Sequence, residues 1–232
     1  MFVLIVLTVI TLCNCETTGF TDELAREYMF VMSAAAYSDK PGECMKKFKN
    51  ATVYNQTYAE CTGNCSGFTA VMHEKQAIVL SFRYVGTTDM QQLFAEIKES
   101  TFKEWVGFYL MGDYGIVIMT RNYSNWTHGG RVSKYFHDAF LSLWNGGMEK
   151  DFKNLTTYYQ YYEIWVTGHS RGGALATLAA SVVDGQHNQT NVKLVTFGQP
   201  RVGDEKFAEE HHKMVKLHHW PDVSTNSSLS EA

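Results

Sequence analysis

The chain has 232 residues, of which 45% are hydrophobic and 14% aromatic, enough to bury one sizeable core. A net charge of −4 and a pI near 6.1 give no basic surface of the kind that binds nucleic acid, so we expect no nucleic-acid partner. After residue 15 the sequence shows no internal repeat or low-complexity tract and has only three prolines. These features predict one domain over 16–232.

The N-terminus carries an apolar run from Phe2 to Leu12. This run is too short to span a bilayer, which needs about 20 residues, so we expect no stable transmembrane anchor there. It matches the apolar region of a secretory signal, with Cys13 and Cys15 at the small positions before a cleavage site. Because no Lys or Arg precedes it, a short buried helix is the alternative. We predict a signal peptide over 1–15 and an extracellular protein.

The first half then predicts a helix, a strand and a second helix. Residues 21–38 have a capping threonine, acidic residues in the first turn and apolar residues at helical spacing, and Pro41 and Gly42 are expected to end the helix. The apolar run 77–82 predicts a buried strand. Residues 89–97 return to a helical period, and their apolar face consists of Met90, Leu93, Phe94 and Ile97.

Three cysteines, Cys44, Cys61 and Cys65, lie in a stretch after the first helix that we interpret as rich in loops. In an exported chain, three cysteines in one stretch favour one disulfide between two of them. The third thiol then has a partner that is absent from this chain or on another molecule. No histidine pair lies near Cys61 and Cys65 to complete a zinc site, so we predict no metal.

The second half alternates strands and helices. Residues 133–144 carry one apolar helical face and are expected to stop at 145–147, where the sequence reads Asn-Gly-Gly. The stretch 162–166 is a strand candidate, and it leads into a helix whose apolar face precedes Gly185. Residues 192–197 form the next strand. This alternation predicts a largely parallel sheet covered by helices.

Glycosylation sequons are unusually frequent, since eight of the eleven asparagines begin an N-x-S/T triplet. Each marks a candidate glycan site on an exported chain, and together they support secretion. The eight are Asn50, Asn55, Asn64, Asn122, Asn125, Asn154, Asn188 and Asn226.

The segment "VTGHSRGGALATLAA" (166–180) places Ser170 in a G-x-S-x-G pattern between the predicted strand and helix. A serine at such a corner holds a strained backbone that presents its hydroxyl, and bulky neighbours would clash there. Gly168 and Gly172 relieve this crowding, and the following helix points free N–H groups toward an oxyanion at the serine. The pattern alone also fits a helix-opening turn, but its flanking elements favour a nucleophile.

Three further stretches, "AAAYSD" (34–39), "AIVLSFRYVGTT" (77–88) and "VTFGQPRVGD" (195–204), join this one in an order that resembles the fungal-type class 3 lipases. The resemblance covers roughly residues 20–212. It implies an α/β-hydrolase fold with a mostly parallel central sheet flanked by helices. It also implies a lipid ester substrate, met at a lipid–water interface, and chemistry that needs no cofactor.

The resemblance assigns the nucleophile to Ser170 and one oxyanion donor to the backbone N–H of Arg171, where the family usually has an aliphatic residue. The second donor follows an F-R-G sequence in the family, and Thr87 is its candidate here. Because Tyr84 and Val85 separate Phe82-Arg83 from the glycine, they either bulge outward or move the threonine beyond the reach of an oxyanion.

The remaining catalytic groups of the family are an aspartate and a later histidine. Asp222 is the nearest match to the aspartate, and Asp204 is an alternative that the family uses structurally. His169 matches a structural histidine of the family. No histidine follows Asp222, so the C-terminal part of the family domain looks incomplete. Four earlier histidines are interpreted as polar surface residues, namely His211, His212, His218 and His219.

The helix 89–97 lies where the family carries a mobile lid, and a permanently packed core helix is the alternative. Two functions follow for the chain. The first is a secreted serine hydrolase that cleaves triacylglycerol-type esters through an acyl-enzyme on Ser170. The second is a catalytically impaired protein of the same fold that binds hydrophobic esters without turnover. The identity of the general base separates them.

Overall fold

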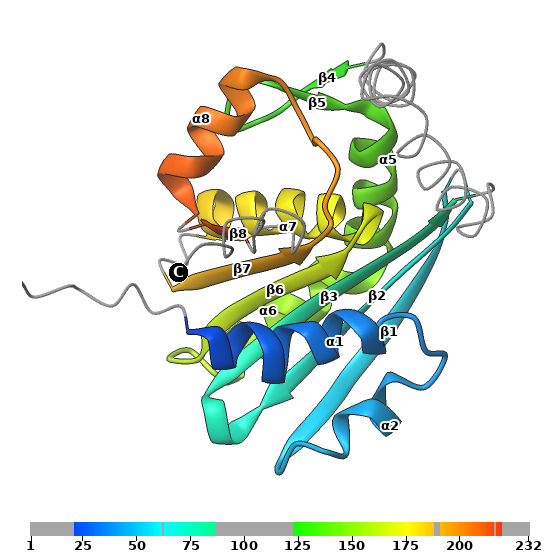
Figure 1. Cartoon of the computed structure of the whole chain (residues 1–232), viewed down its shortest axis with the longest axis vertical. Coiled ribbons are helices and arrows are strands. Elements are labelled where there is room, and N and C mark those ends of the chain that lie inside the picture. The colour runs from blue at the N-terminus through cyan, green and yellow to red at the C-terminus, as the bar shows by residue number, and fades with distance from the viewer. Residues whose placement is uncertain (1–20, 62, 87–122, 188–190, 216, 220–232) are drawn as a thin grey trace, which may run out of the picture.

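A computed structural model describes residues 21–61, 63–86, 123–187, 191–215 and 217–219. Its main sheet has six strands in the order β1-β2-β3-β6-β7-β8, and helices cover both faces (Figure 1). The predicted signal peptide and the predicted helix 89–97 lie outside the described residues. The helical cover leaves two apolar cores, one on each face of the sheet.

The first three strands form an antiparallel meander of β1 (Ala51–Cys61), β2 (Gly63–Met72) and β3 (Ala77–Gly86), with a 3₁₀ turn at His73–Lys75. The expectation of a loop-rich stretch after the first helix is therefore wrong. β1 is the edge of the sheet and is largely exposed, so a polar sequence rich in Thr and Tyr can form it.

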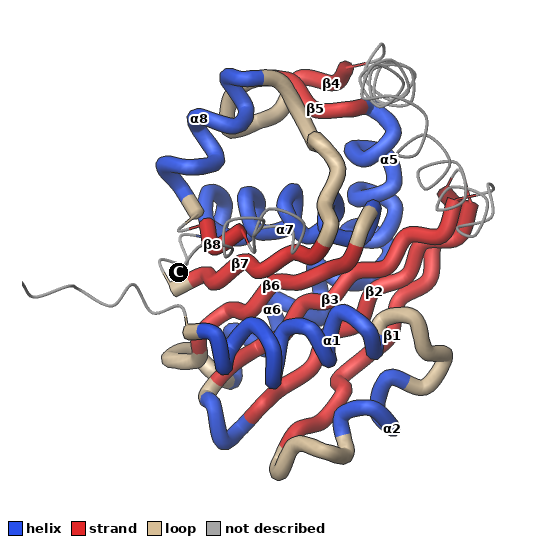
Figure 2. The backbone as a smooth tube through the Cα atoms, in the orientation of Figure 1, coloured by secondary structure: helices blue, strands red, loops and turns tan. Residues whose placement is uncertain are grey.

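The other strands are parallel to β3 and confirm the predicted parallel half of the sheet. β6 (Glu163–His169) pairs with β3, β7 (Val192–Phe197) with β6, and β8 (Leu217–His219) with β7. Since all four run the same way, as the arrows of β3, β6 and β7 show in Figure 1, their carboxyl ends meet at one edge of the sheet, which is drawn in red in Figure 2. Ser170 follows β6 at that edge.

The N-terminal helix begins as a π-helical turn, Leu24–Met29, and continues as α1 (Phe30–Ala35). The Thr21 hydroxyl accepts the N–H of Leu24 at 3.0 Å, as expected for a capping residue. The predicted role of Pro41 is incomplete, because this proline also starts a short helix, α2 (Pro41–Met45).

The helix predicted over 133–144 is α5 (Lys134–Leu143), but the glycines after it do not stop it. The chain continues through a π-helical turn, Trp144–Met148, into α6 (Glu149–Tyr158), which the sequence analysis missed. Gly147, at φ 148°, makes a kink rather than an end.

The helix after Ser170, α7 (Arg171–His187), passes through Gly185 instead of ending before it. A Cβ at Gly185 would lie 2.4 Å from the His128 ring, so this glycine serves packing. β4 (Tyr123–Asn125), β5 (Arg131–Ser133) and α8 (Glu205–Met214) complete the fold.

The sequons have different surroundings. Asn50, Asn64 and Asn125 are exposed, whereas Asn154 is half-buried. Asn55 is exposed, yet its Nδ2 donates to the buried Asp151 carboxylate at 2.8 Å. The other three sequon asparagines, Asn122, Asn188 and Asn226, lie outside the described residues.

A disulfide joins Cys61 to Cys65 at the tip of the β1–β2 hairpin, while Cys44 is exposed and free. The predicted single disulfide within the trio is therefore present, and it lies in a hairpin rather than a loop. It fastens the end of an edge strand that is otherwise held from one side only.

Breaking the disulfide should lower the free energy of unfolding by about 2 kcal/mol, because the bond closes a short loop in the unfolded chain. Urea unfolding of Cys61→Ala/Cys65→Ala measures the loss. Cys44→Ala is the matched control and should leave the midpoint unchanged. Equal midpoints for all three proteins would contradict the expected stabilisation.

Candidate active site

Ser170 occupies the turn between β6 and α7 with a φ of 53°, in the left-handed region that side chains rarely adopt. Two backbone hydrogen bonds hold it there. Its N–H donates to the carbonyl of Phe197 at 2.8 Å, and its own carbonyl accepts the N–H of Gly173 at 2.9 Å. The end of β7 and the first turn of α7 therefore fix the serine in a strained conformation.

The two glycines that flank Ser170 are required by close backbone contacts. A Cβ at Gly168 would lie 2.3 Å from the carbonyl oxygen of Gly172. A Cβ at Gly172 would lie 2.3 Å from the carbonyl oxygen of Phe82 and 3.1 Å from the Cα of Arg83. Three backbone segments thus meet at the corner, with no room for a side chain between them.

α7 begins at Arg171, directly after the serine, so its first N–H groups have no carbonyl partner within the helix. The positive end of the helix dipole lies at the same place and favours negative charge there. The Arg171 side chain is buried, with its guanidinium 5.9 Å from the ring centre of Tyr84. The side chain of Arg171 is thus buried within the fold, whereas the backbone N–H of the same residue lies beside Ser170.

His169, the residue before the serine, is engaged elsewhere. Its Nδ1 lies 3.1 Å from the Tyr37 hydroxyl, and burial lowers the pKa of the imidazole, which keeps the ring neutral near pH 7. Burial raises the pKa of Tyr37, opposed by the nearby Arg83 and Arg171. Arg83 also donates to the Tyr37 carbonyl at 3.2 Å. Tyr37 and Arg83 thus join three sequence motifs, a connection that sequence reasoning missed.

The strand that precedes Thr87 is regular to its end. β3 pairs with β2 from Met72↔Ala77 to Gly63↔Gly86 without a shift in register, so the two extra residues do not bulge outward. Tyr84 and Val85 instead extend the paired part of β2 and β3. From Phe82, which pairs with Gly168, the strand runs four residues, or about 13 Å, to Gly86. Thr87 itself lies outside the described residues.

His211 was expected at the surface, and this expectation is wrong. Its side chain is 3% exposed, and its Nε2–H donates to the carbonyl of Thr177 in α7 at 3.1 Å. Burial lowers its pKa to about 4. The cause is helix packing, since α8 turns this residue inward against α7. His212 is exposed, and the side chains of His218 and His219 lie outside the description.

Asp204 has a structural role in the fold. Its carboxylate caps α8 by accepting the N–H of Phe207 at 3.0 Å, and it also pairs with Arg131 at 3.0 Å. Asp222 lies outside the described residues. Across the ranges that the structure describes, no hydrogen bond joins Ser170 to an imidazole, and no cluster of His, Cys, Asp and Glu is arranged to hold a metal ion.

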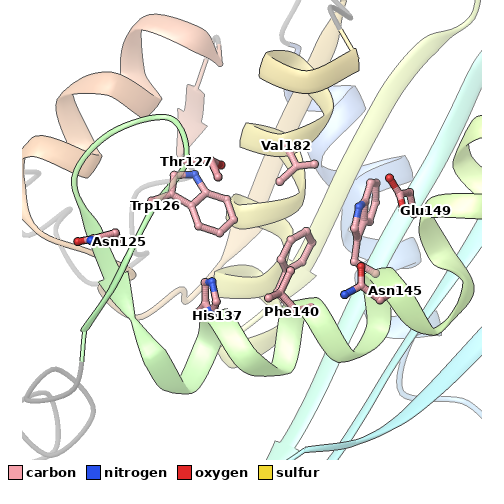
Figure 3. A pocket seen from close by; sticks show the side chains of 10 residues that line it. Asn125, Trp126, Thr127, His137, Phe140, Asn145, Glu149 and Val182 are labelled. Carbon is pink, nitrogen blue, oxygen red and sulfur yellow. The ribbon is translucent and has the colours of Figure 1, made fainter.

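A separate cleft of about 270 Å³ lies between the β4–β5 turn, α5 and α7 (Figure 3). Trp126 and Phe140 form part of its lining, and the Trp126 indole N–H donates to Ser181 at 2.9 Å. Ser170 and its neighbours at the corner do not contribute to it. Its walls come from segments far apart in the sequence, which is why no single stretch predicted it.

The fold and this corner define a class of protein. A strained serine between a parallel strand and a helix, at the carboxyl edge of a helix-covered sheet, is the α/β-hydrolase arrangement. A solved structure shares the fold. The lipase from Rhizopus microsporus var. chinensis matches with a TM-score of 0.65 and 20% identity. The match covers 86% of this chain and 66% of the lipase chain.

Within that class, the chain belongs to the class 3 lipase family, whose family model, Lipase (class 3), matches residues 79–227. Lipase ZK262.3 of Caenorhabditis elegans is 32% identical over 203 residues, which cover 84% of this chain and 51% of the relative. Secreted mono- and diacylglycerol lipase 2 of Gibberella zeae is 37% identical over 75 residues, 31% of this chain and 18% of the relative. The chain spans about half the length of the nematode relative.

Gly172→Ala should destabilise the protein by about 1–3 kcal/mol, because the new Cβ meets backbone atoms that cannot move aside. Gly42→Ala is the control, since nothing lies within 4 Å of its Cβ position. Thermal unfolding of the two variants makes the comparison. Similar melting temperatures would show that the corner relaxes.

The low pKa of His211 predicts a loss of stability in acid. Between its ordinary pKa of 6.5 and its folded value of about 4, the unfolded chain binds more protons than the folded one. The contribution of the neutral His211 to the free energy of unfolding is fully present above pH 6.5. It falls by up to about 3 kcal/mol as the pH drops from 6.5 to about 4. His211→Gln should flatten the decline in urea unfolding, whereas the exposed His212→Gln should not. If the free energy of unfolding of His211→Gln fell with pH as steeply as that of the wild type, the lowered pKa of His211 would not be the cause of the acid sensitivity.

Proposed function

We propose that this protein is a serine hydrolase that cleaves lipid esters of the triacylglycerol type. The observation that carries the proposal is Ser170, held at φ 53° between β6 and the first turn of α7 in a chain of the class 3 lipase family. Because the left-handed conformation is costly for a serine, the fold that maintains it favours a functional hydroxyl.

The proposed reaction proceeds in two steps. The Ser170 oxygen attacks the ester carbonyl carbon and gives up its proton to a general base, and the alcohol leaves with a proton to form an acyl-enzyme. Water then attacks the acyl carbon, releases the fatty acid and restores the serine proton. The Arg171 N–H, at the start of α7, stabilises the oxyanion in both steps.

The other proposed roles rest on motif positions, because the residues lie outside the described ranges. Asp222 orients the base, and the predicted helix 89–97 covers the site in water. Thr87 is the candidate for the second oxyanion donor, and this role requires the chain to turn back toward Ser170 after Gly86, because β3 runs about 13 Å past Phe82 without a bulge. Export is proposed from the apolar segment within 1–15, the eight sequons and the fungal relative named as a secreted lipase. None of the described helices is long and apolar enough to cross a membrane.

The second candidate is a protein of this fold that binds esters without turnover. It is favoured by the hydrogen bonds of two described histidines, one bond at the corner and one further along α7. His169 lies against Tyr37, and His211 donates into α7, so neither imidazole is bonded to Ser170. A serine without a base stays protonated, and only binding and the oxyanion site then accelerate hydrolysis.

The proposal predicts that Ser170→Ala keeps the fold and lowers ester hydrolysis by at least about 10³-fold, because the attacking atom is removed. The measurements are turnover of p-nitrophenyl butyrate and emulsified tributyrin, and labelling by a fluorophosphonate. Ser142→Ala is the matched control, an exposed serine of α5 that should retain full activity. A wild-type protein that is folded, unlabelled and without turnover would instead contradict hydrolysis and favour the second candidate.

A further inference from the structure

A second cleft, of about 370 Å³, opens between β1 and α6, at the end of the parallel strands opposite Ser170. We name it the tyrosine cleft. Apart from one valine, its lining consists of Thr52, Tyr54, His73, Leu155, Tyr158 and Tyr159. Its volume lies within the range of about 300–1,000 Å³ that is usual for small-molecule sites.

Two tyrosines of the cleft are left open to water. Tyr158, at the end of α6, is 78% exposed, and Tyr54, on the edge strand β1, is 46% exposed. Among the described residues, no aromatic ring stacks on Tyr158, whereas Tyr159 stacks on Tyr162 with ring centres 4.9 Å apart. The open ring of Tyr158 is therefore a surface available to a ligand.

The lining indicates the chemistry of that ligand. It contains no Asp, Glu, Lys or Arg, so it offers no charge to an anion or a cation. It combines aromatic faces with the hydroxyls of Thr52 and the tyrosines and with the His73 imidazole. An aromatic face attracts C–H groups that carry partial positive charge, and hydroxyls bond to polar groups. A neutral sugar ring has both features, a C–H face and a polar rim.

A sequon lies beside this cleft. Asn154 precedes Tyr158 by one helical turn, so the two side chains share a face of α6. The Asn154 Nδ2, the atom to which a glycan is attached, donates to the Tyr54 hydroxyl at 3.4 Å. A sugar on this nitrogen would leave the chain between the two exposed rings.

We propose that the first N-acetylglucosamine of a glycan on Asn154 binds in the tyrosine cleft, with its ring against Tyr158. The proposal rests on the proposed export, because sequons are glycosylated in secreted chains. Covalent attachment places the sugar at a high effective concentration, so a weak aromatic contact is enough to hold it. The bound sugar covers the seam between β1 and α6 and stabilises the edge of the sheet.

The test uses the full chain secreted from eukaryotic cells, with site occupancy measured by mass spectrometry. Four proteins form a cycle: wild type, Tyr158→Thr, Asn154→Gln and the double variant. Tyr158→Thr should lower the melting temperature by about 2–4 °C where Asn154 carries its glycan and should have no effect in the Asn154→Gln background. Trimming the glycan to its first sugar should leave the wild-type melting temperature unchanged.

Tyr161→Thr is the matched control, since Tyr161 is 92% exposed but does not line the cleft. It should have no effect in either background. An equal effect of Tyr158→Thr with and without the glycan would overturn the proposal. So would a bare Asn154 in a protein whose Asn50 or Asn64 is modified. If no sequon is modified, the proposed export fails as well, which separates the two failures.

Discussion

The structure depends on one constraint, the contact of three backbone segments at the corner that holds Ser170. The carbonyl oxygen of Phe82 occupies the space that a Cβ of residue 172 would need. The carbonyl oxygen of Gly172 likewise occupies the space that a Cβ of residue 168 would need. This contact sets how closely α7 lies against β3 and β6. The buried face of α7 then fills the core beneath the sheet. The strained conformation of the half-buried Ser170 is thus a consequence of how the backbone packs.

Three parallel strands, β3, β6 and β7, were predictable because their middle residues are buried on both faces of the sheet and therefore form short apolar runs. β7 (Val192–Phe197) was predicted with its bounds intact. The edge strand β1 was not predictable in this way, since one side of it faces water and its sequence is polar. Gly146 and Gly147 indicated a helix end, but Gly147 at φ 148° redirects the chain into α6. A glycine allows both outcomes, and only packing decides between them.

The candidate site likewise has features that the sequence predicted and features that it did not. The Ser170 turn is a local pattern, and its spacing together with the predicted strand before it and helix after it pointed to a strained corner. The link between Tyr37 and His169 joins residues 132 positions apart, and no spacing rule reports it. The burial of His211 was hidden as well, because α8 has only a few apolar residues and its charged sequence suggested a surface. In each case the missing information was which element packs against which.

The hydrogen bond from the Ser170 N–H to the Phe197 carbonyl has a consequence for how the protein is made. The serine enters the growing chain 27 residues before the carbonyl that holds its left-handed turn. During synthesis the meander of β1, β2 and β3 can pair from local segments, whereas the serine turn waits for β7 to join the sheet. The hydrogen bond that holds the left-handed turn therefore cannot form until translation has passed residue 197.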